Sequence, residues 1–281
     1  MRLTFYGVRG SVPTPGEAYA RYGGNTACVH IELADGTDIV LDSGTGIRLL
    51  GNKLRSKDTP IHLLLSHNHW DHIQGFPFFS PIFQKDRDIY IYPGQTTLPE
   101  HDQILQQMEG STFPVPVSAL QSKLHLTIIP PEQDIWEIGT ATIRRIPINH
   151  PGKGSAYSIE EKGIKIAYIT DNELYPPYKK ETDFLTFVDF ARNADVIIHD
   201  AQYMMSDMPA KTGWGHSVAE EAVKLAMASN SKKLALYSHD PDRTDKDIDK
   251  VVEHCMDYIT IAESNLEIFA SAEGQSLDFT N

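Results

Sequence analysis

The stretch Ser66-His67-Asn68-His69-Trp70-Asp71-His72 places three histidines and one aspartate within six positions, directly after the apolar run 61–65. Side chains of these types at this density neither pack a hydrophobic core nor form a good turn. Imidazole and carboxylate groups are common ligands of transition-metal ions. The stretch therefore predicts a metal site that can face two adjacent ions from one loop, with ligands His67, His69, Asp71 and His72. The alternative is a solvated polar loop in which the cluster arose by chance.

The length and composition of the chain are those of a globular protein. Its 281 residues can bury a large core in one or two domains. We expect no membrane association, because no apolar run approaches the roughly 20 residues that a membrane span needs. The amino terminus lacks the layout of a signal peptide, so we expect the protein in the cytoplasm, with Cys28 and Cys255 as reduced, buried thiols.

The net charge of the chain is −13 with neutral histidines. Because this charge opposes non-specific attraction to a polyanion, it disfavours long nucleic acid as a partner and favours a small substrate. Two bound divalent cations would add about four positive charges at the place where an anion docks, which limits the inference.

Hydrophobic patterning predicts a sheet-rich fold with helices outside. Strands are expected over 2–8, 26–33, 38–41, 61–65, 89–92, 124–129, 140–148, 156–159, 164–169, 195–198 and 233–237. A short helix is expected over 47–54. Two longer helices are expected at 218–228, opened by a capping box at 217–220, and after Thr244, with apolar positions from Ile248 to Ile259.

Several polar residues lie just beyond the apolar runs, where predicted strands end. They are Asp42, His67, His150, Asp171, Asp200 and His239. Sheets covered by helices place ligand sites outside the carboxyl ends of strands, so these side chains can converge on one rim. Asp42 could accept the free ring N–H of a ligating histidine and fix its tautomer, or it could simply cap the helix that follows.

The stretch His67 to His72 resembles the H-x-H-x-D-H motif of the metallo-β-lactamase superfamily. His150, Asp171 and His239 resemble its three later ligand positions, and Asp42 in Leu41-Asp42-Ser43-Gly44-Thr45-Gly46 matches as well. The resemblance extends over essentially the whole chain. It implies an α/β fold in one domain over residues 1–281, a four-layer αββα sandwich with the site along one edge, and a two-metal hydrolase.

The resemblance also implies which residue holds which ion. One ion would bind His67, His69 and His150, the other would bind Asp71, His72 and His239, and Asp171 would bridge them. The ligand types suit zinc, with manganese as the alternative. A redox di-iron branch of the superfamily has an acidic residue at the position of His69, which disfavours oxygen or nitric oxide chemistry. A hydroxide bridging the ions would be the nucleophile.

The segment Gly213-Trp214-Gly215-His216-Ser217 resembles the G-H-S motif of the phosphodiesterase branch, which includes tRNA 3′-processing endonucleases and cyclic-phosphate phosphodiesterases. This likeness implies that His216 donates a proton near the scissile phosphate, oriented by Asp200 or Glu173. The alternative is a structural histidine in a glycine-rich turn. The expected catalytic residues are Asp71, His216 and Asp200.

The substrate expected from the sequence is a small or cyclic phosphodiester, such as a cyclic nucleotide or cyclic ribose phosphate. The interval 75–148 shows no basic, glycine-rich arm of the kind that a tRNA-processing enzyme would use to grip folded RNA. The alternatives are a tRNA 3′-processing-like endonuclease, a hydrolase of thioester or lactone bonds, and a non-catalytic sensor. Arg9 could contact a phosphate, and the apolar stretch 76–83 could support a homodimer or belong to the core.

Overall fold

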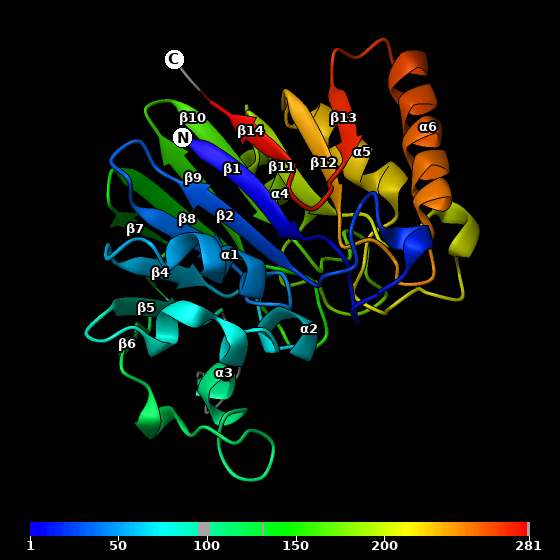
Figure 1. Ribbon diagram of the computed structural model, residues 1–281. Coiled ribbons are helices and arrows are strands. Elements are labelled where there is room, and N and C mark those ends of the chain that lie inside the picture. The colour runs from blue at the N-terminus through cyan, green and yellow to red at the C-terminus, as the bar shows by residue number, and fades with distance from the viewer. Residues whose placement is uncertain (95–101, 131, 280–281) are drawn as a thin grey trace.

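The computed structural model describes residues 1–94, 102–130 and 132–279, whose strands form two seven-stranded sheets lying face to face (Figure 1). In order, the first sheet contains β14 (Ser276–Asp278), β1 (Arg2–Gly7), β2 (Cys28–Glu32), β3 (Asp38–Leu41), β4 (Ile61–Leu64), β5 (Asp88–Tyr92) and β6 (Lys123–Leu126). The second contains β13 (Glu267–Ala270), β12 (Lys233–Tyr237), β11 (Val196–Asp200), β10 (Ile164–Ile169), β9 (Ser155–Glu161), β8 (Ala141–Pro147) and β7 (Ile135–Ile138).

Each sheet has a parallel half and an antiparallel half. Strands β3 to β6 are parallel neighbours in the first sheet, and β10 to β13 are parallel neighbours in the second. The remaining pairs are antiparallel, including the predicted hairpin of β9 and β10. Parallel strands end at the same edge of a sheet, so the loops after β3 and β4 share one edge and the loops after β10, β11 and β12 share another.

Hydrophobic side chains form three core layers that separate four layers of secondary structure. Phe5, Tyr157 and Tyr237 are among the side chains buried between the two sheets. The outer face of the first sheet is covered by α1 (Ile47–Leu54), α2 (Trp70–Ile73), α3 (Gln103–Gln106) and the 3-10 turns Phe76–Phe78 and Ser80–Phe83. The outer face of the second sheet is covered by α4 (Phe184–Phe190), α5 (Ala219–Ala228) and α6 (Asp245–Ile261). The predicted αββα sandwich is confirmed.

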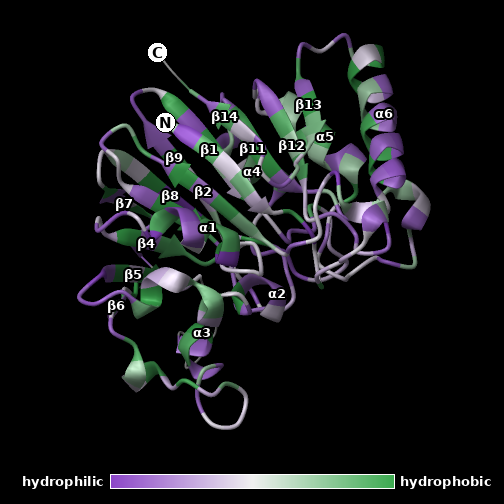
Figure 2. Cartoon of the chain, viewed as in Figure 1, coloured by the Kyte–Doolittle hydropathy of each residue, from purple (hydrophilic) through white to green (hydrophobic). Residues whose placement is uncertain are grey.

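Helix α6 shows how the outer helices are held. Hydrophilic and hydrophobic residues alternate along it (Figure 2), and the apolar ones, including Ile248 and Cys255, are buried against α5 and β13. Cys255 and Cys28 are both buried free thiols, as expected. In the described part of the chain, no helix is both long enough and apolar enough to cross a membrane.

The structure differs from the sequence-based prediction mainly at the edges of the sheets. Strands β7, β13 and β14 were not predicted, and each is an edge strand of three or four residues with partly exposed side chains. The capping box predicted at Ser217 is absent, because the Ser217 hydroxyl donates to the carbonyl of Asn172 at 2.6 Å and α5 begins at Ala219. The predicted cap at Thr244 is present, with Asp247 as its partner. Further 3-10 turns span Glu17–Tyr19, Val117–Ala119 and Met205–Asp207.

Candidate metal centre and active site

The predicted site residues lie at a rim of the sandwich where strands from both sheets end. Asp42 follows β3, Asp171 lies two residues after β10, and Asp200 is the last residue of β11. Asp42 and Asp171 have φ angles of 60° and 45°. This left-handed region is unfavourable for residues with a side chain, although Asp tolerates it better than most. Such backbone positions often cluster at functional sites, and here they belong to two buried carboxylates.

The first group of close donor atoms comes from His67, His69, His150 and Asp171, and all four atoms lie within 4.8 Å of one another. Nε2 of His150 is 3.0 Å from Nδ1 of His69, and Nε2 of His67 is 3.6 Å from Oδ2 of Asp171. Nε2 of His67 is buried and has no hydrogen-bond partner among the described residues. A buried nitrogen of this kind is costly unless a ligand satisfies it, so a cation fits among these four side chains.

The second group contains Asp71, His72 and again Asp171. Nε2 of His72 lies 3.1 Å from Oδ2 of Asp171 and 3.3 Å from Oδ2 of Asp71. Because Asp171 belongs to both groups, one carboxylate joins them. This donor set of nitrogen and oxygen atoms suits a second divalent cation beside the first.

Hydrogen bonds at Nδ1 orient the rings of two predicted ligands, His72 and His150. Nδ1 of His72 is 2.8 Å from Oδ2 of Asp42, and Nδ1 of His150 is 2.7 Å from the carbonyl oxygen of Gly215. With Nδ1–H donating in both rings, Nε2 is the atom that carries the metal-binding lone pair when the ring is neutral. Asp42 also accepts from the backbone N–H of Ser66 at 2.6 Å, the Ser66 hydroxyl at 2.8 Å and the Tyr168 hydroxyl at 2.7 Å. The buried Asp42 carboxylate therefore joins both sheets behind the site.

Three of the histidines are held neutral. Burial keeps the pKa of His67 well below its ordinary value and lowers the pKa of His69. Burial also lowers the pKa of His150 to about 4. A neutral imidazole is the form that binds a metal ion, so these rings need not lose a proton to become ligands at neutral pH.

His72 and two neighbouring carboxylates, those of Asp71 and Asp171, are charged. Burial alone would lower the pKa of His72, but Asp171, Asp71 and Asp42 hold it well above its ordinary value. Burial alone would raise the pKa of Asp171, but the imidazoles of His72 and His216 hold it well below the ordinary value. The site thus concentrates negative charge that divalent cations can neutralise, and cation binding is expected to release the proton of His72.

His239 is buried close to this rim but belongs to neither group of close donor atoms among the described residues. Its Nε2 lies 2.9 Å from the carbonyl oxygen of Ser271, which leaves the lone pair on Nδ1. The preceding residue, Ser238, donates to Oδ1 of Asp171 at 3.3 Å. The loop that carries His239 therefore contacts the shared carboxylate, and its role as a ligand stays a prediction.

Arg9 is not available to a phosphate. Its side chain is fully buried, and Nε donates to the carbonyl of Gly23 at 2.8 Å. Nη1 donates to the carbonyls of Asp240 and Arg243 at 3.1 and 2.7 Å. Arg9 thus joins the amino-terminal loop to the loop after β12, and its side chain bonds to protein carbonyls and not to a phosphate, a contact that the sequence had left possible.

His216 lies beside the two groups of close donor atoms and is hydrogen-bonded to Asp200. Its Nδ1 is 2.9 Å from Oδ2 of Asp200, and its ring centre is 5.3 Å from that of His150. Donor atoms of Asp171, Asp200 and His216 lie within 4.8 Å of one another. Burial alone would lower the pKa of His216, but Asp200 and Asp171 raise it to about 9. His216 is therefore protonated at neutral pH.

Glu173, the other residue considered as a partner of His216, holds the loop before it. Its carboxylate accepts hydrogen bonds from the backbone N–H of Gly213 at 2.9 Å and of Gly215 at 3.0 Å. The carbonyl of Gly215 in turn accepts from His150. Glu173 thus fixes the segment that both supports the predicted ligand His150 and carries His216. The sequence contains no signal for this role, because the backbone N–H groups that donate to the Glu173 carboxylate lie about 40 residues further along the chain.

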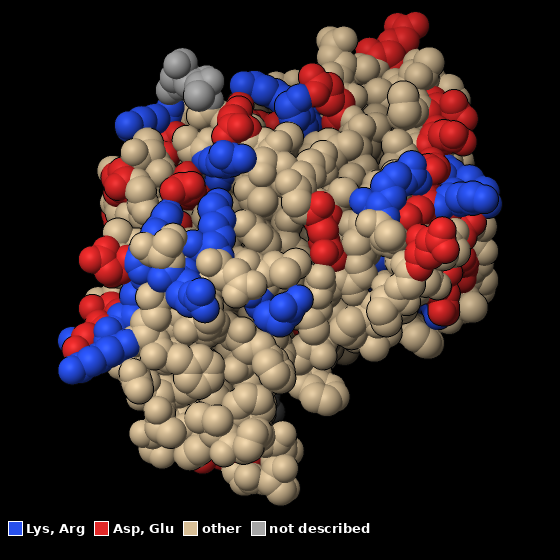
Figure 3. All heavy atoms as spheres, in the orientation of Figure 1, with Lys and Arg blue, Asp and Glu red and all other residues tan. Residues whose placement is uncertain are grey.

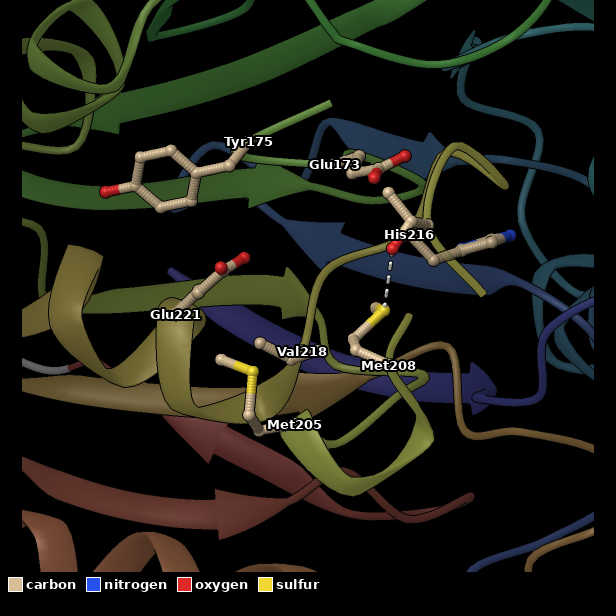
Figure 4. A pocket seen from close by; sticks show the side chains of 8 residues that line it. Glu173, Tyr175, Met205, Met208, His216, Val218 and Glu221 are labelled. Carbon is tan, nitrogen blue, oxygen red and sulfur yellow. Dashed lines mark hydrogen bonds between the residues drawn. The ribbon is translucent and has the colours of Figure 1, made fainter. Parts of the chain in front are cut away.

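A cavity of about 90 Å³ lies beside His216 (Figure 4). It is lined by Glu173, Tyr175, Met205, Met208, Thr212, His216, Val218 and Glu221. In Figure 4 the imidazole of His216 points away from Tyr175 and Glu221, which line the same cavity. Burial, assisted by Glu173 and Glu220, raises the pKa of Glu221 to about 7.

An αββα sandwich with this His and Asp cluster at its rim defines a metal-dependent hydrolase of the metallo-β-lactamase type. The family model described as the beta-lactamase superfamily domain matches residues 37–239, which include all the predicted ligands. The chain belongs to the beta-lactamase superfamily.

Three proteins similar to this chain are named as a ribonuclease Z, a tRNase Z and a diphosphatase. Ribonuclease Z of Thermoplasma volcanium is 26% identical over 289 residues, which cover 87% of this chain and 89% of that protein. The short form of human tRNase Z matches with a TM-score of 0.65 and 18% identity over 100% of both chains. A diphosphatase of the PhnP family matches with a TM-score of 0.68 and 17% identity over 99% of this chain and 98% of that one.

These comparisons confirm the predicted phosphodiesterase branch and the predicted class of enzyme, a metal-dependent hydrolase. They overturn the expectation that long nucleic acid is disfavoured, because proteins named as ribonucleases match most of the chain. The physical reason for the error is that net charge averages over the whole surface, whereas binding depends on the charge near the site.

Proposed function

We propose that the chain is a two-metal phosphodiesterase, folded as one domain over residues 1–281, that cleaves RNA as an endonuclease of the tRNA 3′-processing type. The observation that carries this proposal is the position of His216, a buried imidazole bonded to Asp200 beside the shared carboxylate of Asp171. Cleavage of a phosphodiester leaves an alkoxide that needs a proton, and His216 can supply it. RNA is proposed as the substrate because similar proteins are named as ribonucleases.

The residues proposed to hold the ions follow from the two donor groups. His67, His69 and His150 would hold one ion, Asp71 and His72 would hold the other with His239, and Asp171 would join them. We infer zinc as the native ion, with manganese as the alternative, from the mixture of imidazole and carboxylate ligands. When bound, two such ions supply Lewis acidity that lowers the pKa of water to about 7 and stabilises charge on the oxygens of the phosphate.

The side chains of the chain itself position the proton donor. Nδ1 of His216 is bonded to Asp200, so Nε2 is the nitrogen that can pass its proton to the leaving oxygen. Asp200 also accepts from the backbone N–H groups of Asn172 at 3.1 Å and Ser217 at 3.2 Å. These contacts fix the position of the Asp200 carboxylate, so it orients the imidazole of His216. Asp71, the remaining proposed catalytic residue, is kept ionised next to His72.

The experiment is an assay of the purified, zinc-loaded protein on a tRNA precursor with a 3′ extension, next to bis(p-nitrophenyl) phosphate and a thioester. The proposal predicts release of the 3′ extension, with zinc dependence, and hydrolysis of the chromogenic diester. Failure to cleave the RNA while the chromogenic diester is hydrolysed would contradict the RNA substrate but not the phosphodiesterase. Turnover of the thioester alone, unaffected by His216→Ala, would replace the whole proposal with thioester or lactone hydrolysis.

A second candidate function is hydrolysis of a small or cyclic phosphodiester. The specific observation in its favour is the likeness, over nearly the whole chain, to a diphosphatase of the PhnP family. A panel of cyclic nucleotides and cyclic ribose phosphates, assayed next to the tRNA precursor, separates the two candidates by kcat/KM.

A further inference from the structure

Two segments next to the metal site form one continuous outer surface. The backbone N–H of Ser43 donates to the carbonyl of His72 at 2.8 Å, and the N–H of Gly75 donates to the carbonyl of Ser43 at 2.9 Å. At the far end of α1, the Gln84 side chain donates to the carbonyl of Arg55 at 3.0 Å. Helix α1 therefore lies along the segment 72–85. With its eight residues, α1 gives this surface a length of about 12 Å from the metal-site end.

This surface is basic in an acidic protein. The chain has 38 acidic and 25 basic residues, yet the stretches 43–57 and 72–85 contain neither Asp nor Glu. Arg48, Lys53 and Arg55 are exposed, and none of them forms a salt bridge within the described ranges. Figure 3 shows Lys and Arg side chains gathered over the part of the molecule where α1 lies, above a largely uncharged surface. The local charge is thus opposite in sign to the net charge.

Aromatic side chains are exposed on the same surface. Trp70, at the start of α2 between two predicted ligands, is 72% exposed, and Phe78 is 59% exposed. Phe78 meets Phe113 edge to face at a ring distance of 5.6 Å. Exposed aromatic rings are platforms on which unpaired bases stack, while neighbouring cations bind the phosphates between them.

We propose that the surface defined by Arg48, Lys53, Arg55, Trp70 and Phe78, here called the α1 face, binds the unpaired RNA strand that leads away from the scissile phosphate. The inference rests on the proposed function and adds a binding site to it. Exposed cations together with exposed aromatic rings fit a single strand, because each nucleotide offers one phosphate and one base. The contact between Ser43 and His72 connects this face directly to the metal site.

The test compares two triple variants that remove the same charge. The first is Arg48→Gln, Lys53→Gln and Arg55→Gln, and the control is Lys224→Gln, Lys246→Gln and Lys250→Gln on α5 and α6. KM is measured for RNA with a single-stranded 3′ extension, at several salt concentrations, and for bis(p-nitrophenyl) phosphate. Thermal unfolding shows that each variant is folded.

The α1-face variant should raise the KM for RNA at least tenfold and make its salt dependence shallower. Loss of three phosphate contacts reduces the slope of log affinity against log salt by about 2 for a single strand. The control should leave both quantities unchanged, and kcat/KM for the chromogenic diester should stay constant in both variants. Phe78→Ala should raise the KM for RNA about fivefold or more, because one stacked base is lost.

Two negative results are distinguishable. If the wild-type protein cleaves RNA and the α1-face variant shows the KM and salt slope of the control, the α1 face does not bind the strand and the inference is wrong. If the wild-type protein hydrolyses the chromogenic diester but neither binds nor cleaves RNA, the proposed function fails, and the α1 face fails with it.

Discussion

The Nδ1 atom of His216 lies 2.9 Å from Oδ2 of Asp200, and this pair stands beside the carboxylate that joins the two metal groups. The pair places a protonated imidazole next to a site built for cations. A protonated group in such a position is electrostatically unfavourable unless a carboxylate compensates it, and Asp200 does so. This arrangement fits a reaction in which the His216 imidazole donates its proton.

Replacement of His216 by Ala should reduce kcat for a diester with an alkoxide leaving group by about 10²–10⁴, the usual contribution of general acid catalysis. A p-nitrophenolate leaving group needs little protonation, so bis(p-nitrophenyl) phosphate should lose much less activity. Metal content, measured by mass spectrometry of the elements, should not change. Equal losses for both leaving groups would show that His216 is not the proton donor.

Asp200→Asn should shift the alkaline limb of the rate profile to lower pH. Asp200 is a main cause of the raised pKa of His216, about 9 in the wild-type protein. Without the carboxylate that pKa falls, and the protonated donor is lost at a lower pH. The measurement is the pH dependence of kcat/KM for an alkyl diester. An unchanged alkaline limb would contradict the pairing.

Glu173→Gln should reduce activity by roughly 10-fold or more, because a charged acceptor of two backbone N–H groups is lost and such bonds each contribute about 1.5–3 kcal/mol. Glu173 acts through the loop that carries His216, so kcat should fall while KM for a small diester changes little. Glu181→Gln, an exposed change, is the control. Unaltered kcat in Glu173→Gln would show that the loop is positioned without this carboxylate.

Asp42→Ala should destabilise the fold by roughly 3–5 kcal/mol, the cost of leaving a buried charged partner unpaired. Four hydrogen bonds converge on this carboxylate, including the one from Nδ1 of His72. Metal affinity should also fall by about 10–100-fold, because His72 loses the acceptor that orients it. Denaturant unfolding with and without zinc measures both, and Asp58→Asn, at an exposed position, should change neither.

Glu221 should make stability depend on pH. Its pKa is raised by burial from 4.5 to about 7, so the protonated form is favoured in the folded protein. That contribution is complete below pH 4.5 and is lost as the pH rises through about 7. Glu221→Gln keeps a neutral side chain, so its melting temperature relative to that of the wild type should rise between pH 4.5 and about 7 and then stay constant at higher pH. A difference that does not vary with pH would contradict this.

The sequence predicts those parts of the fold and site that depend on local pattern. Strand runs and the Thr244 cap are visible because burial and capping follow short-range rules, and strand ends locate Asp42 and Asp171. The choice between Asp200 and Glu173 as the partner of His216 is not visible. Both residues lie at or shortly after the end of a strand, and only their distances in space separate them.

Other features cannot be predicted from local sequence patterns, and Ser217 and the edge strands are examples. Ser217 has the residue type of a helix cap, but its hydroxyl is bonded to a carbonyl 45 residues away. Edge strands such as β13 and β14 are short and partly exposed, so their hydrophobic pattern is weak. Net charge likewise conceals the basic α1 face, because carboxylates elsewhere on the chain outweigh it.

Metal content per chain tests the central claim most directly. The wild-type protein, loaded with zinc and freed of excess, should hold two ions per chain, because Asp171 is shared by two groups of donor atoms. Asp171→Ala should remove most of that metal, while Asp58→Asn should retain both ions. A wild-type protein that binds no zinc, or an Asp171→Ala variant that still binds two ions, would contradict the account of this rim as a dinuclear metal centre.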